Sequence, residues 1–168
     1  EIGSVGNTGL NSDFTLHYIE GLCKAGNVDV RKVLKHSLCL SADVNAAYDP
    51  TFASVFEEKN SCYLNKGVVL TKYTGARGKS GSNDASAETM AKVIQIMDEA
   101  GVYWQIGELG AVDVGGGGTV AKYVANQDID TIDIGVPVLS MHSPFEIVSK
   151  ADVYMAYLTF KAFCEDAE

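Results

Sequence analysis

The chain has 168 residues, 46% of them hydrophobic, which is enough apolar material for one ordinary globular core and too much for a disordered chain. Its formal net charge of −9 comes from 22 acidic and 13 basic residues, and a chain of this sign repels phosphate backbones and anionic lipid surfaces. We therefore expect no nucleic-acid partner and no membrane partner.

Two helices and a strand are predicted in the first part of the chain. Apolar residues within 11–23 recur at three- and four-residue spacings, which is typical of an amphipathic helix, and a second short helix is predicted for 29–36. The apolar run 37–43 favours a buried strand with Asp43 at its carboxyl end. Turn-forming residues over 48–65 predict a surface loop.

Strands and helices alternate over the rest of the chain. β-Branched and aromatic residues predict a strand at 67–73, and a basic glycine–serine loop follows at 74–82. A capped amphipathic helix then runs up to Gly101. The other expected elements are a strand at 102–106, a glycine loop at 113–119, a helix at 120–126, a strand at 131–141 and a terminal helix at 145–164.

This alternation predicts an α/β fold, a three-layer αβα sandwich with a mostly parallel sheet and helices on both faces. In such sheets ligands gather at the carboxyl ends of the strands. Asp43, the loop after Lys72, the glycine loop and His142 all follow strands. We therefore expect one edge of the sheet to collect them.

Three residues have the side chains that a zinc pair needs. Carboxylates and imidazoles bind zinc at neutral pH, and a carboxylate can bridge two ions about 3.5–4 Å apart, so Glu1, Asp43 and His142 are candidate ligands. Considered one at a time, these residues also have a purely structural interpretation: an aspartate after a strand is usually a turn former, and a histidine near a core is usually just hydrogen-bonded. The run Gly115–Gly118 could hold a phosphate at a helix N-terminus, although it matches no nucleotide-binding fingerprint, or it could allow two backbones to approach closely.

The compartment is predicted from the cysteines and from hydropathy. The four cysteines are far apart and make no paired zinc spacing, so we interpret them as reduced thiols of an intracellular protein. No apolar run approaches the roughly 20 residues that span a bilayer. We expect a soluble, cytoplasmic protein, and because the chain opens on Glu1 without an initiator methionine, we interpret it as a fragment or a processed product.

Several short motifs, taken in their order along the chain, resemble the M18 family of zinc aminopeptidases and particularly its bacterial members. They are Glu1-Ile2-Gly3-Ser4, Ser41-Ala42-Asp43, Lys66-Gly67-Val68-Val69, the segment 113–119, and Met141-His142-Ser143 followed by Glu146. The resemblance implies that residues 1–168 form the C-terminal portion of a single catalytic domain of the zinc-peptidase type. The upstream catalytic segment and the family's dimerisation domain would be absent from this chain.

For the whole protein, the resemblance implies a metalloaminopeptidase that hydrolyses N-terminal residues from peptides with a two-zinc site. Glu1, Asp43 and His142 would bind zinc, and the glutamate that acts as general base would lie just before Glu1. Because the other ligands and this base would lie upstream, the isolated chain would be inactive. The family assembles as dodecamers, so a homo-oligomer is expected.

The resemblance also implies where the substrate binds. Lys72, or its neighbour Thr71, aligns with a position that lines the substrate pocket, and Gly116 and Gly117 align with backbone that contacts the substrate. Many members carry histidines where this chain has Ala46 and Asp49, so a preference for acidic residues is not expected. The alternative from another class is a non-catalytic binding or assembly module with the same fold.

Overall fold

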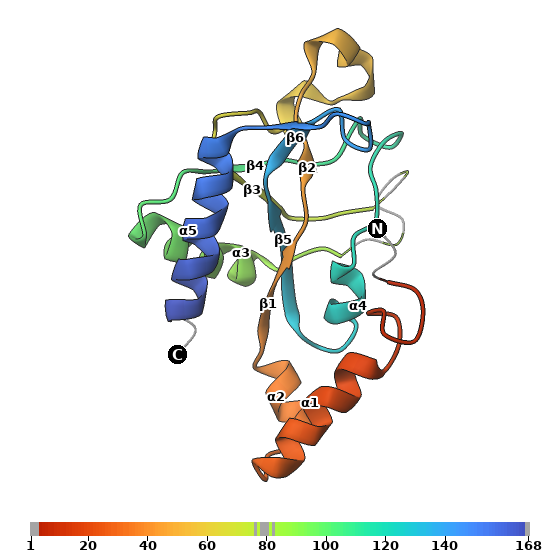
Figure 1. The fold of residues 1–168 in the computed structure, drawn as a ribbon, viewed down its shortest axis with the longest axis vertical. Helices are drawn as coiled ribbons and strands as arrows, with labels where there is room; N and C mark the ends of the chain where they lie inside the picture. Colours follow the sequence, from red (N-terminus) through yellow and green to blue (C-terminus); the bar gives the residue numbers. More distant parts are fainter. Residues whose placement is uncertain (1–3, 76, 78–80, 82, 167–168) are drawn as a thin grey trace.

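The structure is a computed structural model that describes residues 4–75, 77, 81 and 83–166 (Figure 1). Its helices are α1 (Phe14–Ala25), α2 (Val30–Lys35), α3 (Ala87–Glu99), α4 (Ala121–Ala125) and α5 (Lys150–Asp166), with short 3₁₀ helices at Pro50–Val55 and Glu58–Asn60. Its strands are β1 (Leu38–Ala42), β2 (Asn45–Ala46), β3 (Val68–Thr71), β4 (Trp104–Ile106), β5 (Asp130–Gly135), β6 (Pro137–Leu139) and β7 (Ile147–Val148).

The main sheet is mixed, with strand order β1-β5-β3-β4. β1 runs parallel to β5 and β3 runs parallel to β4, but β3 and β5 are antiparallel. Thr71, at the carboxyl end of β3, pairs with Asp133, and Ala42, at the carboxyl end of β1, pairs with the next residue, Ile134. The two strands reach nearly the same level of β5 from opposite directions, so the chain leaves them toward opposite edges of the sheet. The prediction that all carboxyl ends share one edge is wrong, because the two strand pairs point in opposite directions.

A second, smaller sheet has the order β2-β6-β7. The single strand predicted at 131–141 is in fact two strands, β5 and β6, which separate at Val136 and belong to different sheets. The terminal helix begins at Lys150, later than predicted, because Ile147 and Val148 pair with β6 as β7. Both are β-branched residues, which favour a strand over a helix.

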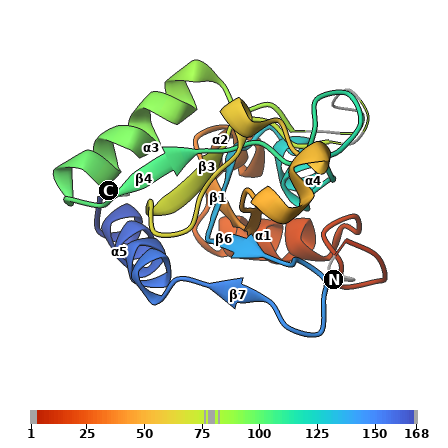
Figure 2. The same cartoon turned by 90° about the horizontal axis from the view of Figure 1, so that it is seen from above.

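Helices cover both faces of the main sheet, as predicted. Figures 1 and 2 show α3 and α5 together on one side of the sheet and α4 on the other. The apolar core lies between the sheet and the α3–α5 pair, and its buried members are Val68, Leu70, Ala85, Met90, Val93, Met97, Val102, Ile132, Ile134 and Ala156. Burial of these side chains is the main favourable contribution to the fold.

The opposite face of the main sheet carries a second, small apolar cluster of Ala47, Cys62 and Val69 and, beside it, polar side chains. Side chains of directly paired residues lie on the same face, so Ser41 of β1, Asp133 of β5 and Thr71 of β3 form one row across three strands. All three are buried, and α4 lies on their side. We call these three residues the polar row.

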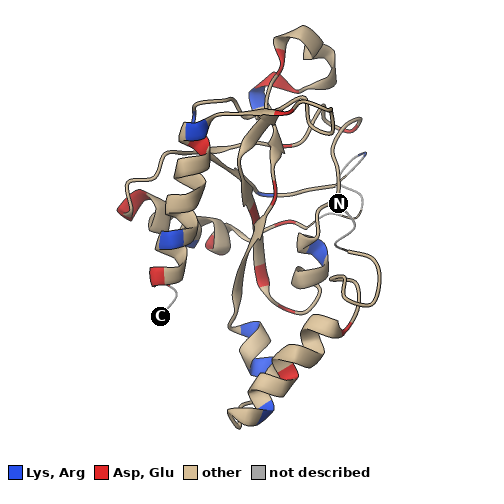
Figure 3. Ribbon diagram, in the orientation of Figure 1, with Lys and Arg blue, Asp and Glu red and all other residues tan. Residues whose placement is uncertain are grey.

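Charged residues are spread over many elements. Figure 3 shows lysines and arginines on separate helices, among them α2, α4 and α5, while acidic residues also lie on strands and connecting loops. Within the described part of the chain, no helix is long and apolar enough to cross a membrane.

The start of β3 is held by a carboxylate from α5. Asp152, 1% exposed, accepts hydrogen bonds from the backbone N–H of Asn65 at 2.8 Å and of Gly67 at 2.9 Å. A Cβ on Gly67 would lie 2.0 Å from the carbonyl oxygen of Tyr103, so this turn also requires glycine. Asp152 therefore fixes the turn from which β3 enters the sheet. We call these two hydrogen bonds the Asp152 clamp.

We expect Asp152→Ala to lower the free energy of unfolding by about 2–4 kcal/mol, because two backbone amides lose a charged partner. Urea unfolding of the protein that carries this chain measures the change. Asp166→Ala, at an exposed position in the same helix, is the matched control and should change it by less than about 0.5 kcal/mol. Equal effects from the two variants would contradict the clamp.

Candidate metal centre and substrate site

Asp43 lies where β1 ends and the chain passes to β2. Its backbone N–H donates to the carbonyl of Ile134 at 3.2 Å, and its Oδ1 accepts from the backbone N–H of Val44 at 2.8 Å. The side chain is exposed and lines a cavity together with Ser4 and Thr119. Asp43, a candidate metal ligand, thus follows the end of a strand, as predicted, and its side chain faces a cavity.

Gly135 of β5 determines where the Asp43 backbone can lie. A Cβ built on Gly135 would stand 1.4 Å from the Asp43 carbonyl oxygen. No side chain fits there without a shift of the backbone, so glycine is required although its φ is ordinary. The sequence alone does not single out Gly135, because its contact is with Asp43, which lies far away in the chain.

His142 lies in the turn after β6. Its φ is +67°, and its backbone N–H donates to the carboxylate of Glu146. Because β2 and β6 are parallel, Asp43 precedes one end of their ladder and His142 follows the other end. Glu1, the third predicted ligand, lies outside the described residues. Within those residues, no group of three or more histidine, cysteine, aspartate or glutamate side chains could hold a metal ion.

Asp133, the centre of the polar row, was not anticipated as a site residue. It is 3% exposed, and its Oδ2 accepts from the Thr119 hydroxyl at 3.0 Å. Burial raises the pKa of the Asp133 carboxyl and the charge of Asp43 raises it further, while the hydrogen bond from the Thr119 hydroxyl opposes the shift. Asp133 Oδ1 and Ser41 Oγ are both buried without a hydrogen-bond partner among the described residues. The strand end therefore carries two carboxylates that repel each other.

Lys72 follows β3 and its amine is engaged within the protein. Nζ forms an ion pair with Asp84 and donates to the carbonyl of Ala85 at 3.1 Å. The backbone N–H of Ala85 donates in turn to the Lys72 carbonyl at 2.7 Å. The predicted substrate-binding role of Lys72 stays a prediction, and a substrate group that used this amine would compete with Asp84.

The glycine loop packs against the loop that follows β3. Gly116 has φ +99°, and a Cβ on it would lie 2.1 Å from the carbonyl oxygen of Gly75. Gly75 N–H donates to the carbonyl of Gly117 at 2.8 Å. A Cβ on Gly117, by contrast, would meet no atom within 4 Å. Gly116 is therefore glycine because two loops of the protein approach closely, and Gly117 has space beside it.

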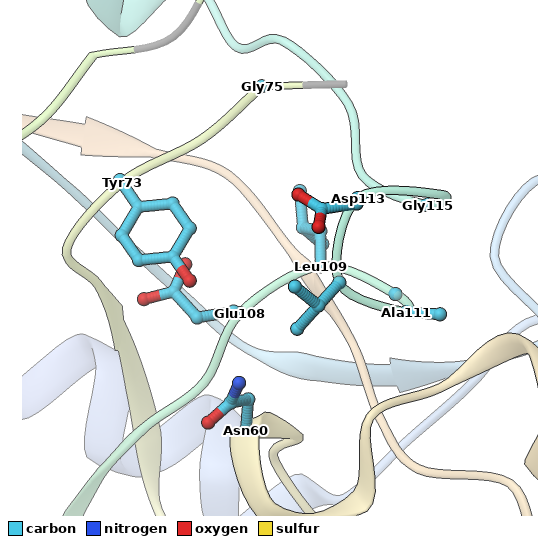
Figure 4. Close-up of a pocket in the computed structure, with 10 residues that line it drawn as sticks. Asn60, Tyr73, Gly75, Glu108, Leu109, Ala111, Asp113 and Gly115 are labelled. Carbon is cyan, nitrogen blue, oxygen red and sulfur yellow. The ribbon is translucent and has the colours of Figure 1, made fainter. Parts of the chain in front are cut away.

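These two loops form the walls of a second cavity. It is lined by Asn60, Tyr73, Glu108, Asp113 and Gly115, among others. Figure 4 shows the Tyr73 ring and the Glu108 carboxyl beside each other, with Asp113 on the glycine-loop wall. Burial raises the pKa of the Tyr73 phenol, and the carboxylates of Glu108, Asp84 and Asp113 add to the shift. The cavity is acidic, and the Tyr73 phenol keeps its proton.

Cys62 is a buried thiol next to the Asp43 segment. Its Sγ lies 3.4 Å from Asn45 Oδ1 and from the carbonyl oxygen of Ala46. Burial raises the pKa of Cys62 to about 12, so the group stays protonated and can donate to these oxygens. The structure has all four cysteines as free thiols.

Comparison with known proteins identifies the class of this fold. A profile of the family described as aminopeptidase I zinc metalloprotease (M18) matches residues 1–164. The chain is 48% identical to a probable M18 family aminopeptidase 1 of Clostridium acetobutylicum, over 97% of this chain and 36% of that protein. For a probable M18 family aminopeptidase 1 of Thermotoga maritima, the identity is 45% over 98% of this chain and 38% of that protein.

Solved structures agree with this match. The crystal structure of an M18 aminopeptidase from Thermotoga maritima has a TM-score of 0.90 at 44% identity, and the match covers 96% of this chain and 37% of that one. The structure of the S. cerevisiae mApe1 dodecamer has a TM-score of 0.75 at 25% identity, over 98% of this chain and 36% of that one. The fold and the sequence match together place the chain in a family described as zinc metalloproteases. The chain belongs to the M18 family of aminopeptidases, which confirms the predicted resemblance, and it spans about a third of the length of these relatives.

We expect Gly135→Ala to displace Asp43 and to lower the zinc content of the protein that carries this chain. The added Cβ cannot coexist with the Asp43 carbonyl, and a close-packed interior accommodates such a clash only by moving the backbone. Zinc content per protein and thermal stability measure the effect. Gly21→Ala is the control, because a Cβ there meets nothing within 4 Å in helix α1. A Gly135→Ala protein with normal zinc content and stability would contradict this assignment.

We expect iodoacetamide at pH 8 to label Cys164, which is exposed, well before Cys62. With a pKa of about 12, Cys62 has a thiolate fraction on the order of a thousandfold below that of an ordinary cysteine. Peptide mapping by mass spectrometry over time follows both sites, and unfolding in urea should remove the difference. Equal labelling rates in the folded protein would show that Cys62 is not held as described.

Proposed function

We propose that the protein that carries this chain is an aminopeptidase that uses two zinc ions to hydrolyse the N-terminal residue of peptides. The observation that carries this proposal is the M18 match over residues 1–164. The exposed Asp43 carboxylate, which lines a cavity at the end of β1, supports it.

The residue types present are those of a zinc centre. A carboxylate oxygen and an imidazole nitrogen are both zinc donors, and Asp43 and His142 are both exposed at the ends of strands. Burial is the main cause of the raised pKa of Asp133, and the charge of Asp43 adds to it; a cation beside Asp43 would offset that added repulsion. The donor chemistry and the local charge therefore favour a divalent cation here.

When bound, zinc supplies Lewis acidity to the scissile carbonyl and to the attacking water. Asp43 and His142, with Glu1 as a further carboxylate, are the residues that the resemblance assigns to the metal, and they would hold it from separate loops. The space beside Gly117 allows a peptide backbone to lie along the glycine loop, and Gly116 keeps that loop against Gly75. The general base is the glutamate that the resemblance assigns just before Glu1.

Three further features of the proposed enzyme follow. The carboxylates of Glu108 and Asp113 in the Figure 4 cavity repel an acidic side chain, which supports a preference for peptides with neutral or basic N-terminal residues. The dodecamer of the relative mApe1 supports a homo-oligomeric assembly. The four free thiols support a reducing, cytoplasmic location.

We expect the complete enzyme to release N-terminal residues from short peptides, to lose this activity on chelation and to regain it with zinc. Asp43→Ala and His142→Ala should each lower kcat/KM by at least about a hundredfold, because loss of a direct ligand costs more than loss of an outer partner. Asp130→Ala and His36→Ala are matched controls of the same residue types, with Asp130 at the opposite end of the β1–β5 pair. Full activity of metal-free enzyme would contradict the zinc mechanism. A folded complete protein without any turnover would favour the non-catalytic module.

A further inference from the structure

We propose that Asn45 is a positioning residue for this reaction. Its buried amide holds the carboxyl ends of β3 and β4, which carry the walls of the Figure 4 cavity, in a fixed position relative to Asp43. The inference rests on the proposed function, because it assigns the metal to the Asp43 side and the substrate to the cavity side.

Asn45 is 2% exposed, and its side chain makes contacts with three separate segments. Nδ2 donates to Thr71 Oγ1 at 2.7 Å and to the carbonyl oxygen of Gly107 at 3.1 Å. Oδ1 lies 3.4 Å from the protonated thiol of Cys62. Both amide hydrogens and the amide oxygen thus have partners, and these partners fix which way the amide points.

The Asn45 side chain is not needed to hold Asp43. The backbone N–H of Asn45 donates to the carbonyl of Val136 at 3.0 Å, and that of Asp43 donates to Ile134. The metal side of the site is therefore anchored to β5 and β6 by backbone hydrogen bonds. Among the hydrogen bonds of the described residues, those of the Asn45 side chain are the ones that extend from this segment to β3 and to the end of β4.

The two acceptors of Asn45 immediately precede the cavity. Thr71 is followed by Lys72 and Tyr73, and Gly107 is followed by Glu108. Tyr73 and Glu108 face each other in Figure 4. One amide therefore fixes the start of both loops that present these side chains.

The mixed topology of the sheet explains why such a link is needed. β2 belongs to the small sheet and β3 to the main sheet, and the described strand ladders join the Asp43–Asn45 segment to β3 and β4 indirectly, through β5. The fit is close, since a Cβ on Gly107 would lie 2.7 Å from Cβ of Cys62. A small loss of register between the two sheets would move the cavity relative to the metal.

The test is a kinetic comparison of Asn45→Ala with the unmodified complete enzyme. We expect KM for a peptide substrate to rise about tenfold while kcat and zinc content stay within about twofold, because only the substrate side loses its anchor. Thr71→Val removes one acceptor and should raise KM in the same direction, whereas Thr71→Ser keeps the hydroxyl and should restore normal KM. The double variant Asn45→Ala with Thr71→Val should raise KM less than the product of the two single effects.

Gln105→Ala is the matched control. The Gln105 amide donates to the carbonyl oxygens of Tyr63 at 2.8 Å and of Gly67 at 3.1 Å, so it crosslinks two segments in the same manner at the opposite end of β3. We expect this variant to lower stability, as Asn45→Ala does, and to leave KM unchanged. This comparison separates positioning from a general loss of stability.

Three results would overturn the inference alone. These are an unchanged KM in Asn45→Ala, a loss of zinc in proportion to the loss of activity, and an equal rise of KM in Gln105→Ala. An unmodified complete enzyme that turns over no peptide would instead overturn the proposed function and the inference with it.

Discussion

The alternation of side chains along β5 is the constraint on which the rest of the structure depends. Ile132 and Ile134 face the core under α3 and α5, while Asp133 and Gly135 face the opposite side. The apolar half provides the stabilising burial. The polar half provides the candidate chemistry, because Asp133 holds the glycine-loop end through Thr119 and Gly135 admits the Asp43 backbone. The two faces of this six-residue strand thus contribute to different properties, one to stability and the other to the candidate site.

Much of the fold could be predicted from local patterns. The spacing of apolar residues indicated α1 and α3, and the apolar run before Asp43 indicated β1. The direction of β3 relative to β5 could not be predicted, because a short buried strand has the same composition in either orientation. The division of 131–141 into two strands was missed for a related reason, since both parts are apolar and only the pairing partners distinguish them.

The candidate site divides in the same way. Asp43 and His142 could be singled out because their residue types are those of metal ligands and both follow strands. Asn45, Asp133 and Gly135 could not, because their importance lies in contacts with residues distant in the chain. Asn45, for example, is 26 residues from Thr71 and 62 from Gly107. Local sequence therefore indicates which groups do chemistry, and the three-dimensional structure indicates which groups hold them in place.

The Asp152 clamp has a consequence for biosynthesis. The two amides that it holds, at Asn65 and Gly67, precede it by 87 and 85 residues. β3 also cannot pair with β5, its antiparallel neighbour, until the ribosome has made some sixty more residues. During translation the β3 segment therefore emerges as an apolar stretch without its partners, and contacts of such long range form slowly. Cotranslational protection of Val68–Thr71, by a chaperone or by the ribosome surface, would matter more for this chain than for one whose strands pair as they emerge.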